Sequence, residues 1–325
     1  MAVQKPVVVV GSINTDLVST SRVIPPIGAT VIGTGFQVHP GGKGANQAVA
    51  VARLGHPVKM IGRVGRDSFG PGQVQYLRSA GVDCTGVAET EGSSGVAVIL
   101  VSERGENCIV VSPGANAKVT PEDIDANLHL IREAGIVLAQ LEIPIPTVAH
   151  LAEVCWRLGV PLMLDPAPAA ALPESLLRCT TWLTPNESEA DFLINLLDGE
   201  TPRAEPSECA DALLSTGCDG VVLKLGDRGA FLASPRIPGE AISAFPVNAV
   251  DTTGAGDAFN GAFATALMQG RSPVESATFA AAAAAISVTR PGAQPSMATL
   301  EEVKDFLDRN LLAEPQVSSI TASEP

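Results

Sequence analysis

The second half of the chain alternates short apolar runs with longer helical stretches, and this rhythm constrains the fold more than any other feature. Candidate strands at 136–140, 161–164, 181–184 and 220–224 alternate with candidate helices near 145–158, 187–197 and 208–215. Strand and helix alternating at this spacing favour a mostly parallel, doubly wound α/β sheet. Aromatic residues make up only 4% of the chain, so we expect a core of Ala, Val, Leu and Ile between sheet and alanine-rich helices.

The remaining elements extend this pattern toward both ends. Strands are expected at 7–11, 31–38 and 57–64, a helix at 45–54, and a hairpin from 96–102 and 107–112. A strand pair near 230–233 and 241–247 precedes two helices at 255–268 and 273–288. Trp156 and Trp182 are expected in the core. No change of composition divides the chain, so one domain over 1–312 is expected, followed by a disordered tail at 313–325 that is rich in Ser, Thr, Glu and Pro.

Charge and cysteine usage limit the partners. Lys and Arg total 21 against 35 Asp and Glu, a formal charge of −14, and no cluster of basic residues stands out. Binding to nucleic acid or to an anionic membrane is therefore not expected. The six cysteines form no CxxC pair, which indicates buried thiols in a reducing cytoplasm. The first residues show no signal peptide.

The first chemical motif is Gly41-Gly42-Lys43-Gly44, directly followed by Ala45, Asn46 and Gln47. Its glycines let the backbone approach a ligand closely, and the helix that follows directs free N–H groups toward the loop. It is not a P-loop, because Gln37 stands where that pattern needs its first Gly. An ordinary turn with a helix cap is the alternative.

The second motif runs from Asp251 to Gly261 and reads Asp-Thr-Thr-Gly-Ala-Gly-Asp-Ala-Phe-Asn-Gly. Residues Gly254 to Gly256 can place several backbone N–H groups in one concavity at a helix start, which stabilises an oxyanion or a phosphate. Asp257 lies in the same turn, where its alternative role is a helix cap. Phe259 occupies the third Gly position of a dinucleotide fingerprint and so argues against one.

A third polar segment, Gly11-Ser12-Ile13-Asn14-Thr15-Asp16, follows the first expected strand. Ligands of open α/β sheets bind beyond the carboxyl ends of strands. Asn14 and Asp16 there offer a donor and acceptors for neighbouring sugar hydroxyls, and a plain turn is the alternative.

Together, these three segments resemble the ribokinase branch of the carbohydrate kinases, which also holds fructokinases and adenosine kinases, and the likeness extends from Val7 to Leu311. The resemblance implies a Rossmann-like αβα sandwich with a small β-sheet lid formed by 16–38 and 96–112. It also implies a homodimer joined through the lid.

The resemblance assigns roles to individual residues. The sugar contacts would be Asn14, Asp16, Gly42, Lys43, Asn46, Glu142 and Asp257. The nucleotide contacts would be Asn186, Glu189, Lys224, Gly226, Gly229 and Gly256, with Mg²⁺ held through water near Glu189. Asp257 would be the general base beside an anion hole formed by the amides of Gly254, Ala255 and Gly256. A K⁺ ion would be bound by Asp251, Thr253, Ser287, Arg290, Gly292 and Ser296.

The activity implied is ATP-dependent phosphorylation of ribose at its primary 5-hydroxyl. Three other acceptors, 2-deoxyribose, fructose and adenosine, remain alternatives. Phe36 is the only aromatic residue in the two lid segments, which disfavours a nucleoside because its base needs a stacking surface. A non-catalytic sugar-binding or sensing protein is the alternative of another class.

Overall fold

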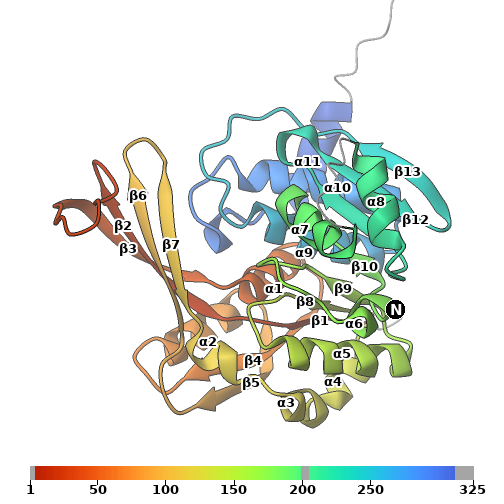
Figure 1. The fold of residues 1–325 in the computed structure, drawn as a ribbon, viewed down its shortest axis with the longest axis horizontal. Coiled ribbons are helices and arrows are strands. Elements are labelled where there is room, and N and C mark those ends of the chain that lie inside the picture. Colours follow the sequence, from red (N-terminus) through yellow and green to blue (C-terminus); the bar gives the residue numbers. More distant parts are fainter. Residues whose placement is uncertain (1–3, 199–204, 312–325) are drawn as a thin grey trace, which may run out of the picture.

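The computed structural model of the chain describes residues 4–198 and 205–311. A nine-stranded sheet forms its centre, in the order β13-β12-β11-β10-β9-β8-β1-β4-β5 (Figure 1). All neighbouring strands pair in parallel except β11–β12 and β12–β13, which are antiparallel. The strands are β1 (Val7–Val10), β4 (Val58–Gly65), β5 (Asp83–Thr90), β8 (Ile136–Ala139), β9 (Leu162–Leu164), β10 (Trp182–Leu183), β11 (Val221–Lys224), β12 (Ala230–Ser234) and β13 (Ile237–Ile242).

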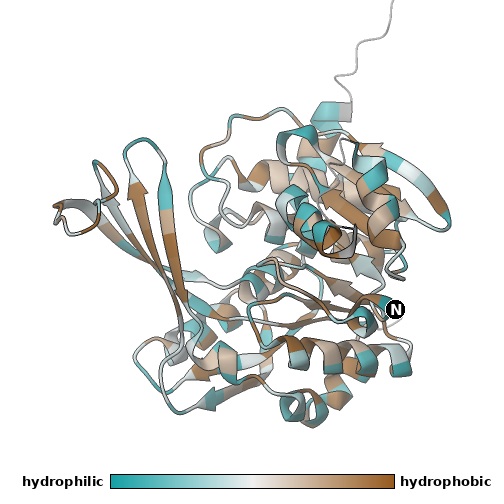
Figure 2. Ribbon diagram, viewed as in Figure 1, coloured by the Kyte–Doolittle hydropathy of each residue, from teal (hydrophilic) through white to brown (hydrophobic). Residues whose placement is uncertain are grey.

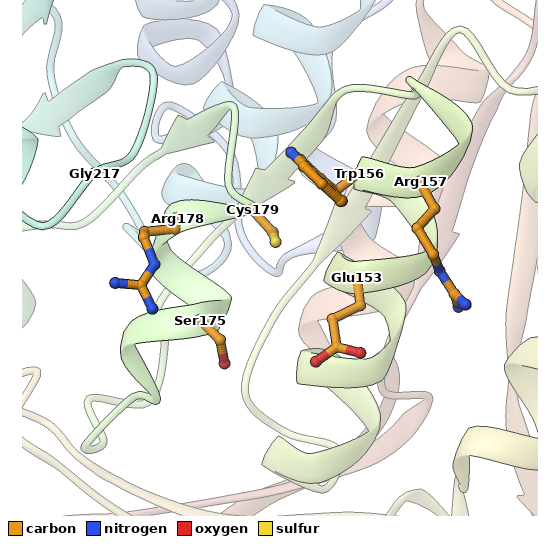
Figure 3. A pocket seen from close by; sticks show the side chains of 7 residues that line it. All are labelled: Glu153, Trp156, Arg157, Ser175, Arg178, Cys179 and Gly217. Carbon is orange, nitrogen blue, oxygen red and sulfur yellow. The ribbon is translucent and has the colours of Figure 1, made fainter.

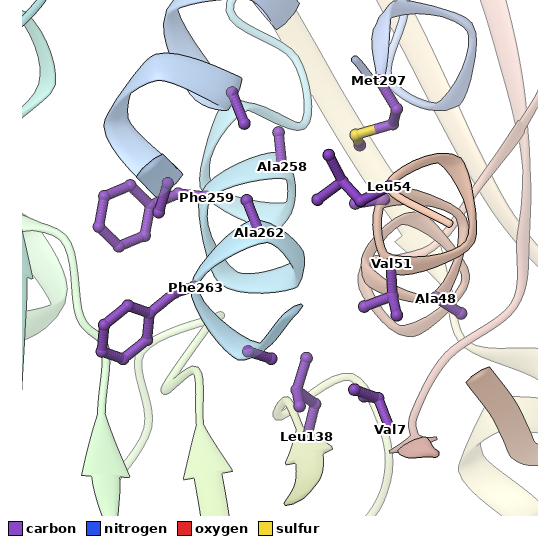
Figure 4. Packing of buried hydrophobic residues seen from close by; sticks show 14 of the residues in the cluster. Val7, Ala48, Val51, Leu54, Leu138, Ala258, Phe259, Ala262, Phe263 and Met297 are labelled. Carbon is purple, nitrogen blue, oxygen red and sulfur yellow. The ribbon is translucent and has the colours of Figure 1, made fainter. Parts of the chain in front are cut away.

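Helices cover both faces of this sheet, which confirms the doubly wound α/β prediction. Alternate side chains of β1 serve the two cores: Val7 and Val9 lie in one apolar cluster, Val8 and Val10 in the other. The first cluster includes residues of α1 (Lys43–Arg53), α2 (Gly70–Ser79), α9 (Ala255–Met268), α10 (Pro273–Ser287) and α11 (Leu300–Leu311). Figure 4 shows part of it, with Ala48 and Val51 of α1 near Ala258 and Ala262 of α9. The second includes residues of α3 (Pro121–Ala126), α4 (Leu128–Glu133), α5 (Ile145–Leu158), α6 (Glu174–Arg178), α7 (Glu187–Asp198) and α8 (Pro206–Leu214).

Small residues allow the helices next to the site to approach closely. A methyl group added to Gly261 of α9 would lie 2.6 Å from the Ala50 Cβ of α1. The two helices therefore pack almost backbone to backbone, and their N-terminal ends are held beside each other.

A second sheet of four strands projects from the body, in the order β3-β2-β6-β7 (Figure 1). It consists of β2 (Asn14–Ser21), β3 (Gly33–Gly41), β6 (Gly95–Ser102) and β7 (Asn107–Ser112). The pairing of Asn14 with Gly41 joins its base to the start of α1. Every residue of β7 is exposed, including Ile109 to Val111, so this sheet carries apolar surface (Figure 2).

Some sequence-based expectations were wrong. The strand expected at 241–247 is β13 at Ile237–Ile242, because β12 turns back at once after Ser234. Trp156 is 70% exposed rather than in the core. Of the six cysteines, three are buried, but Cys108 is exposed and Cys179 and Cys209 are partly exposed.

Several elements had not been predicted as helices or strands: β2, α2, β5, α3, α4, α6 and α11. The expected tail at 313–325 lies outside the described residues. Within the described ranges, no helix combines the length and the apolar character that crossing a membrane requires.

Candidate active site

The polar residues singled out in the sequence converge at the carboxyl edge of the central sheet. The loop after β1 leads to Asn14, and Glu142 follows β8. The N-terminal ends of α1 and α9 carry Lys43 and Asp257 to the same place, as contacts among these residues demonstrate. This is the sheet edge at which α/β proteins bind their ligands.

Asp257 is the centre of a buried hydrogen-bond network and is only 5% exposed. Asn46 Nδ2 donates to its Oδ2 at 2.9 Å, and Gln47 Nε2 donates to its Oδ1 at 3.1 Å. Each carboxylate oxygen has a further lone pair, so Asp257 can still accept a proton from a ligand. The role of a mere helix cap does not account for these contacts from α1.

The network extends behind Asp257 through residues that the sequence analysis did not assign to the site. Gln47 Nε2 also donates to Asp165 Oδ2 at 3.0 Å, and Gln140 Nε2 donates to Gln47 Oε1 at 2.7 Å. Gln294 Nε2 donates to Asn46 Oδ1 at 3.0 Å. Asp165 and Gln140 each follow a buried strand, and that position is the signal by which they could have been found.

Burial sets the protonation of the two central carboxyls. It raises the pKa of Asp257 from 3.8 to about 6, although the nearby Lys43 charge acts in the opposite direction. Burial, together with the charges of Glu142 and Asp257, likewise raises the pKa of Asp16 to about 6. A helix start favours the ionised form of a carboxyl, but the desolvation of Asp257 outweighs this effect. At pH 7 the group is still mostly ionised.

Lys43 is surrounded by negative charge. Burial alone would lower the pKa of its ammonium group, but the carboxylates of Asp257 and Asp165 and others nearby hold it above its usual value. Its side chain is therefore a permanent cation facing the carboxylates of the site.

Asn14 is oriented so that it can donate to a ligand. Asn116 Nδ2 donates to Asn14 Oδ1 at 2.6 Å, which occupies the oxygen of that amide and leaves its NH₂ group available. Glu142 Oε2 accepts from the backbone N–H of Lys43 at 3.2 Å and from the hydroxyl of Ser12. Ser12, which the sequence analysis did not assign, thereby fixes Glu142 beside α1.

Two glycines of the first motif are required by close contact. Gly42 has φ +91°, and a Cβ on it would lie 2.7 Å from the Asn14 backbone nitrogen. A Cβ on Gly44 would lie 2.7 Å from the Ser12 nitrogen. Because neither glycine has a Cβ, the loop after β1 can pack directly against the start of α1.

The turn before α9 has the geometry of an anion site. Gly254 is left-handed at φ +75° and precedes the first helical residue. The N–H of Ala255 donates to Thr252 O at 3.2 Å, whereas those of Gly254 and Gly256 have no acceptor among the described residues. These two amides and the helix dipole can therefore stabilise a negative group.

An apolar cavity of about 500 Å³ opens beside this turn. Four of the expected nucleotide contacts, Lys224, Gly226, Gly229 and Gly256, line it. The remaining wall includes Phe245, Val247, Ala281 and Ala285. Asn186 and Glu189 are not in the lining. They cap α7 reciprocally, with Asn186 N–H to Glu189 Oε2 at 2.8 Å and Glu189 N–H to Asn186 Oδ1 at 2.9 Å.

Asp251 connects the Gly254 turn to the loop after α10. Its Oδ1 accepts from the N–H and hydroxyl of Thr253, and its Oδ2 accepts from Gly292 N–H at 2.7 Å. Ser287 and Ser296 are buried in the same region, and their hydroxyls donate to carbonyls of their own turns. The Arg290 side chain pairs with Glu302, so Arg290 offers this loop only its carbonyl.

A second hollow lies elsewhere, between α5 and α6, around Trp156, Arg178 and Cys179 (Figure 3). None of the residues that the sequence analysis assigned to a site lines it. The chemistry therefore belongs to the sheet edge.

Comparison with known proteins finds a family and relatives that cover nearly the whole chain. Residues 4–300 match the model of the pfkB family of carbohydrate kinases. The chain is 42% identical to a ribokinase of Bacillus subtilis, over 92% of this chain and 98% of that protein. It is 41% identical to a ribokinase of Schizosaccharomyces pombe, over 91% and 96%. The structure of Arabidopsis thaliana ribokinase complexed with ribose and ATP superposes with a TM-score of 0.87 at 36% identity, over 94% and 99%.

Proposed function

This chain belongs to the pfkB family of carbohydrate kinases, and we propose that it transfers the γ-phosphoryl group of ATP to the primary 5-hydroxyl of ribose. The observation that carries the proposal is the position of Asp257, whose buried carboxyl lies in the first turn of α9, accepts a hydrogen bond from Asn46 and is near enough to Lys43 to raise the pKa of its ammonium group. Proteins named ribokinase that cover nearly the whole chain support ribose as the acceptor.

In this mechanism the sugar lies over Asn14, Asp16, Lys43 and Asn46, with Gly42 and Glu142 beside it. Asp257 accepts the proton of the attacking hydroxyl, and a base with a pKa of about 6 is suited to this at neutral pH. The free amides of Gly254 and Gly256 stabilise the negative charge on the phosphoryl group during its transfer. Positioning of the two reactants supplies most of the remaining rate acceleration.

ATP would occupy the cavity beside α9. Its apolar wall of Phe245, Val247, Ala281 and Ala285 suits a base and ribose. Lys224, Gly226, Gly229 and Gly256, which line the same cavity, would face the phosphates. Glu189 and Asn186 lie at the neighbouring start of α7, where Glu189 keeps one carboxylate oxygen free of the cap. Mg²⁺ held there through water would neutralise the β- and γ-phosphates.

The residues around Asp251 fit a monovalent cation such as K⁺. The site offers one carboxylate, the hydroxyl of Ser296, and carbonyls of Thr253, Ser287, Arg290 and Gly292, which suits a hard cation of low charge. Gln294 Oε1 in the same loop is buried with no hydrogen-bond partner among the described residues. The ion would stabilise the two loops that position the α9 turn.

The four-stranded sheet would act as a lid over the sugar, formed by the segments 16–38 and 96–112. Its exposed apolar residues, among them Phe36, Val38, Val98 and Val110, would be covered by the lid of a second copy in a homodimer. Sedimentation equilibrium should give the dimer mass for wild type and the monomer mass for Val110→Asp. A monomeric wild type would exclude this assembly. None of the six cysteines, all of which the structure describes, forms a disulfide, which agrees with a cytoplasmic enzyme.

Release of ADP over a panel of acceptors tests the proposed function. Ribose should give much higher kcat/KM than the other three acceptors. A site built to hydrogen-bond the ribose hydroxyls rejects 2-deoxyribose, which lacks one of them, and it fits fructose and adenosine less well because their hydroxyls or substituents are placed differently. If one of these three were the better substrate, the assignment of ribose as the acceptor would be wrong, but the assignment of kinase activity would stand. Ribose binding without ADP release from any acceptor would indicate a sugar-binding protein instead.

A further inference from the structure

Lys224 stands at the junction between the nucleotide cavity and the network around Asp257. It is the last residue of β11, and its Nζ lies 2.9 Å from Asp165 Oδ1. Both side chains are largely withdrawn from water, with exposed fractions of 13% for Lys224 and 3% for Asp165. The pair is therefore a buried ion pair inside the site and not a surface contact.

The ammonium group lies next to the start of α9. A Cβ added to Gly256 would be 3.3 Å from Lys224 Nζ, so the cation lies close to the backbone of Gly256, whose amide has no acceptor among the described residues. Lys224 and Gly256 also line the same cavity. An oxyanion bound by the Gly256 amide would therefore be within reach of the Lys224 ammonium.

Only part of the hydrogen-bonding capacity of Lys224 is used. An ammonium group has three donors, and the hydrogen bond to Asp165 uses one of them. Asp165 accepts a second hydrogen bond from Gln47, which also holds Asp257. The cation is therefore linked to the base through two side chains, the Asp165 carboxylate and the Gln47 amide.

Stability alone does not account for this pair. Two buried charges lose much hydration, and a hydrogen-bonded neutral pair of the same shape often serves a fold equally well. A cation directed into a phosphate cavity beside free amides has a use in phosphoryl transfer, because negative charge on the transferred group must be stabilised there.

We propose that Lys224 is a catalytic residue whose ammonium group binds oxygens of the γ-phosphoryl group during transfer, and that Asp165 is the positioning residue that holds it. The proposal deepens the proposed function and rests on it. In the step, the acceptor oxygen forms its bond to phosphorus as the bond to the β-phosphate oxygen breaks. The hydroxyl proton goes to Asp257, the leaving electron pair stays on ADP, and Lys224 exchanges no proton.

The test uses three variants of the full chain. Lys224→Gln removes the charge but keeps a donor for Asp165. The double variant Lys224→Gln with Asp165→Asn is a neutral pair that retains an acceptor for Gln47. Lys59→Gln is the matched control, because Lys59 forms a surface ion pair with Glu133 away from the site. Thermal unfolding verifies that each variant is folded.

We expect kcat to fall about 10²–10³-fold in both Lys224 variants, the loss typical of removing one oxyanion donor, while KM for ribose changes less than threefold. Lys59→Gln should keep wild-type kcat. A folded double variant with kcat within threefold of wild type would overturn the proposal, because the pair would then be structural only.

Calorimetric titration with ATP and with AMP gives a second readout that does not depend on turnover. Lys224→Gln should weaken ATP binding at least tenfold and leave AMP binding unchanged, because AMP lacks both the β- and the γ-phosphate. Equal weakening of both, or of neither, would overturn the proposal. If wild type phosphorylates no acceptor, the proposed function fails, and this titration still decides whether Lys224 binds the phosphates.

Discussion

Replacing Asp257 by Asn should remove a pH-dependent loss of stability that the wild-type carboxyl causes, and the size of this loss can be worked out from the site. Burial raises the pKa of this carboxyl from 3.8 to about 6. Ionising it therefore costs the folded chain about 3 kcal/mol more than it costs the unfolded chain. Wild type bears this cost above pH 6, whereas the side-chain amide of the Asp257→Asn variant carries no charge at any pH.

The sign follows from the direction of the shift. A carboxyl whose pKa is raised by folding contributes stability that is present below its unfolded pKa and is lost as pH rises through the folded pKa. Between pH 4 and pH 8, the difference in unfolding free energy between Asp257→Asn and wild type should move by about 2 kcal/mol in favour of the variant. Any constant penalty from imperfect hydrogen bonds to Asn46 and Gln47 cancels in this comparison.

The assay is urea unfolding of both proteins at pH 4 and pH 8, followed by circular dichroism. Asp211→Asn, at an exposed carboxyl on α8, is the matched control and should remain within about 0.5 kcal/mol of wild type at both values. A difference between Asp257→Asn and wild type that does not change with pH would refute the reasoning, because the carboxyl would then not be desolvated in the fold.

Three further predictions concern activity and motion. The kcat/KM of wild type should fall on the acid side with a midpoint near pH 6 as Asp257 is protonated; an acid limb near pH 4 would contradict its buried environment. Replacing Na⁺ by K⁺ at constant ionic strength should increase turnover in wild type but not in Asp251→Ala, and equal responses would exclude the cation site. Ribose should slow amide exchange in 16–38 and 96–112, and unchanged exchange in both would exclude lid closure.

The pattern of apolar residues predicted most of the fold, because the residues whose spacing marked them as core are the ones that the structure buries. The helix expected at 255–268 is α9 with the same bounds, since its start is fixed by Gly254 and its apolar length by the sheet it covers. Trp156 was misplaced because the chain around it is apolar, whereas its position on α5 directs it to solvent. Which face a single side chain occupies depends on tertiary packing that spacing alone does not determine.

The candidate site likewise contains residues that sequence motifs predict and residues that only tertiary packing reveals. The Gly-rich motifs marked the helix starts, and the structure brings them together through hydrogen bonds from Asn46 to Asp257. Asp165 and Gln140 have no surrounding motif, and their contacts join strands and helices more than 90 residues apart in sequence. A network of that kind becomes visible only when the elements are packed.

The most direct test of the account is the turnover of Asp257→Asn with ribose and ATP, measured together with ribose binding by calorimetry. We predict that turnover falls about 10²–10⁴-fold, the usual share of a general base, while ribose still binds with an affinity close to that of wild type. Turnover similar to wild type would contradict the central claim, because proton transfer would then not depend on Asp257.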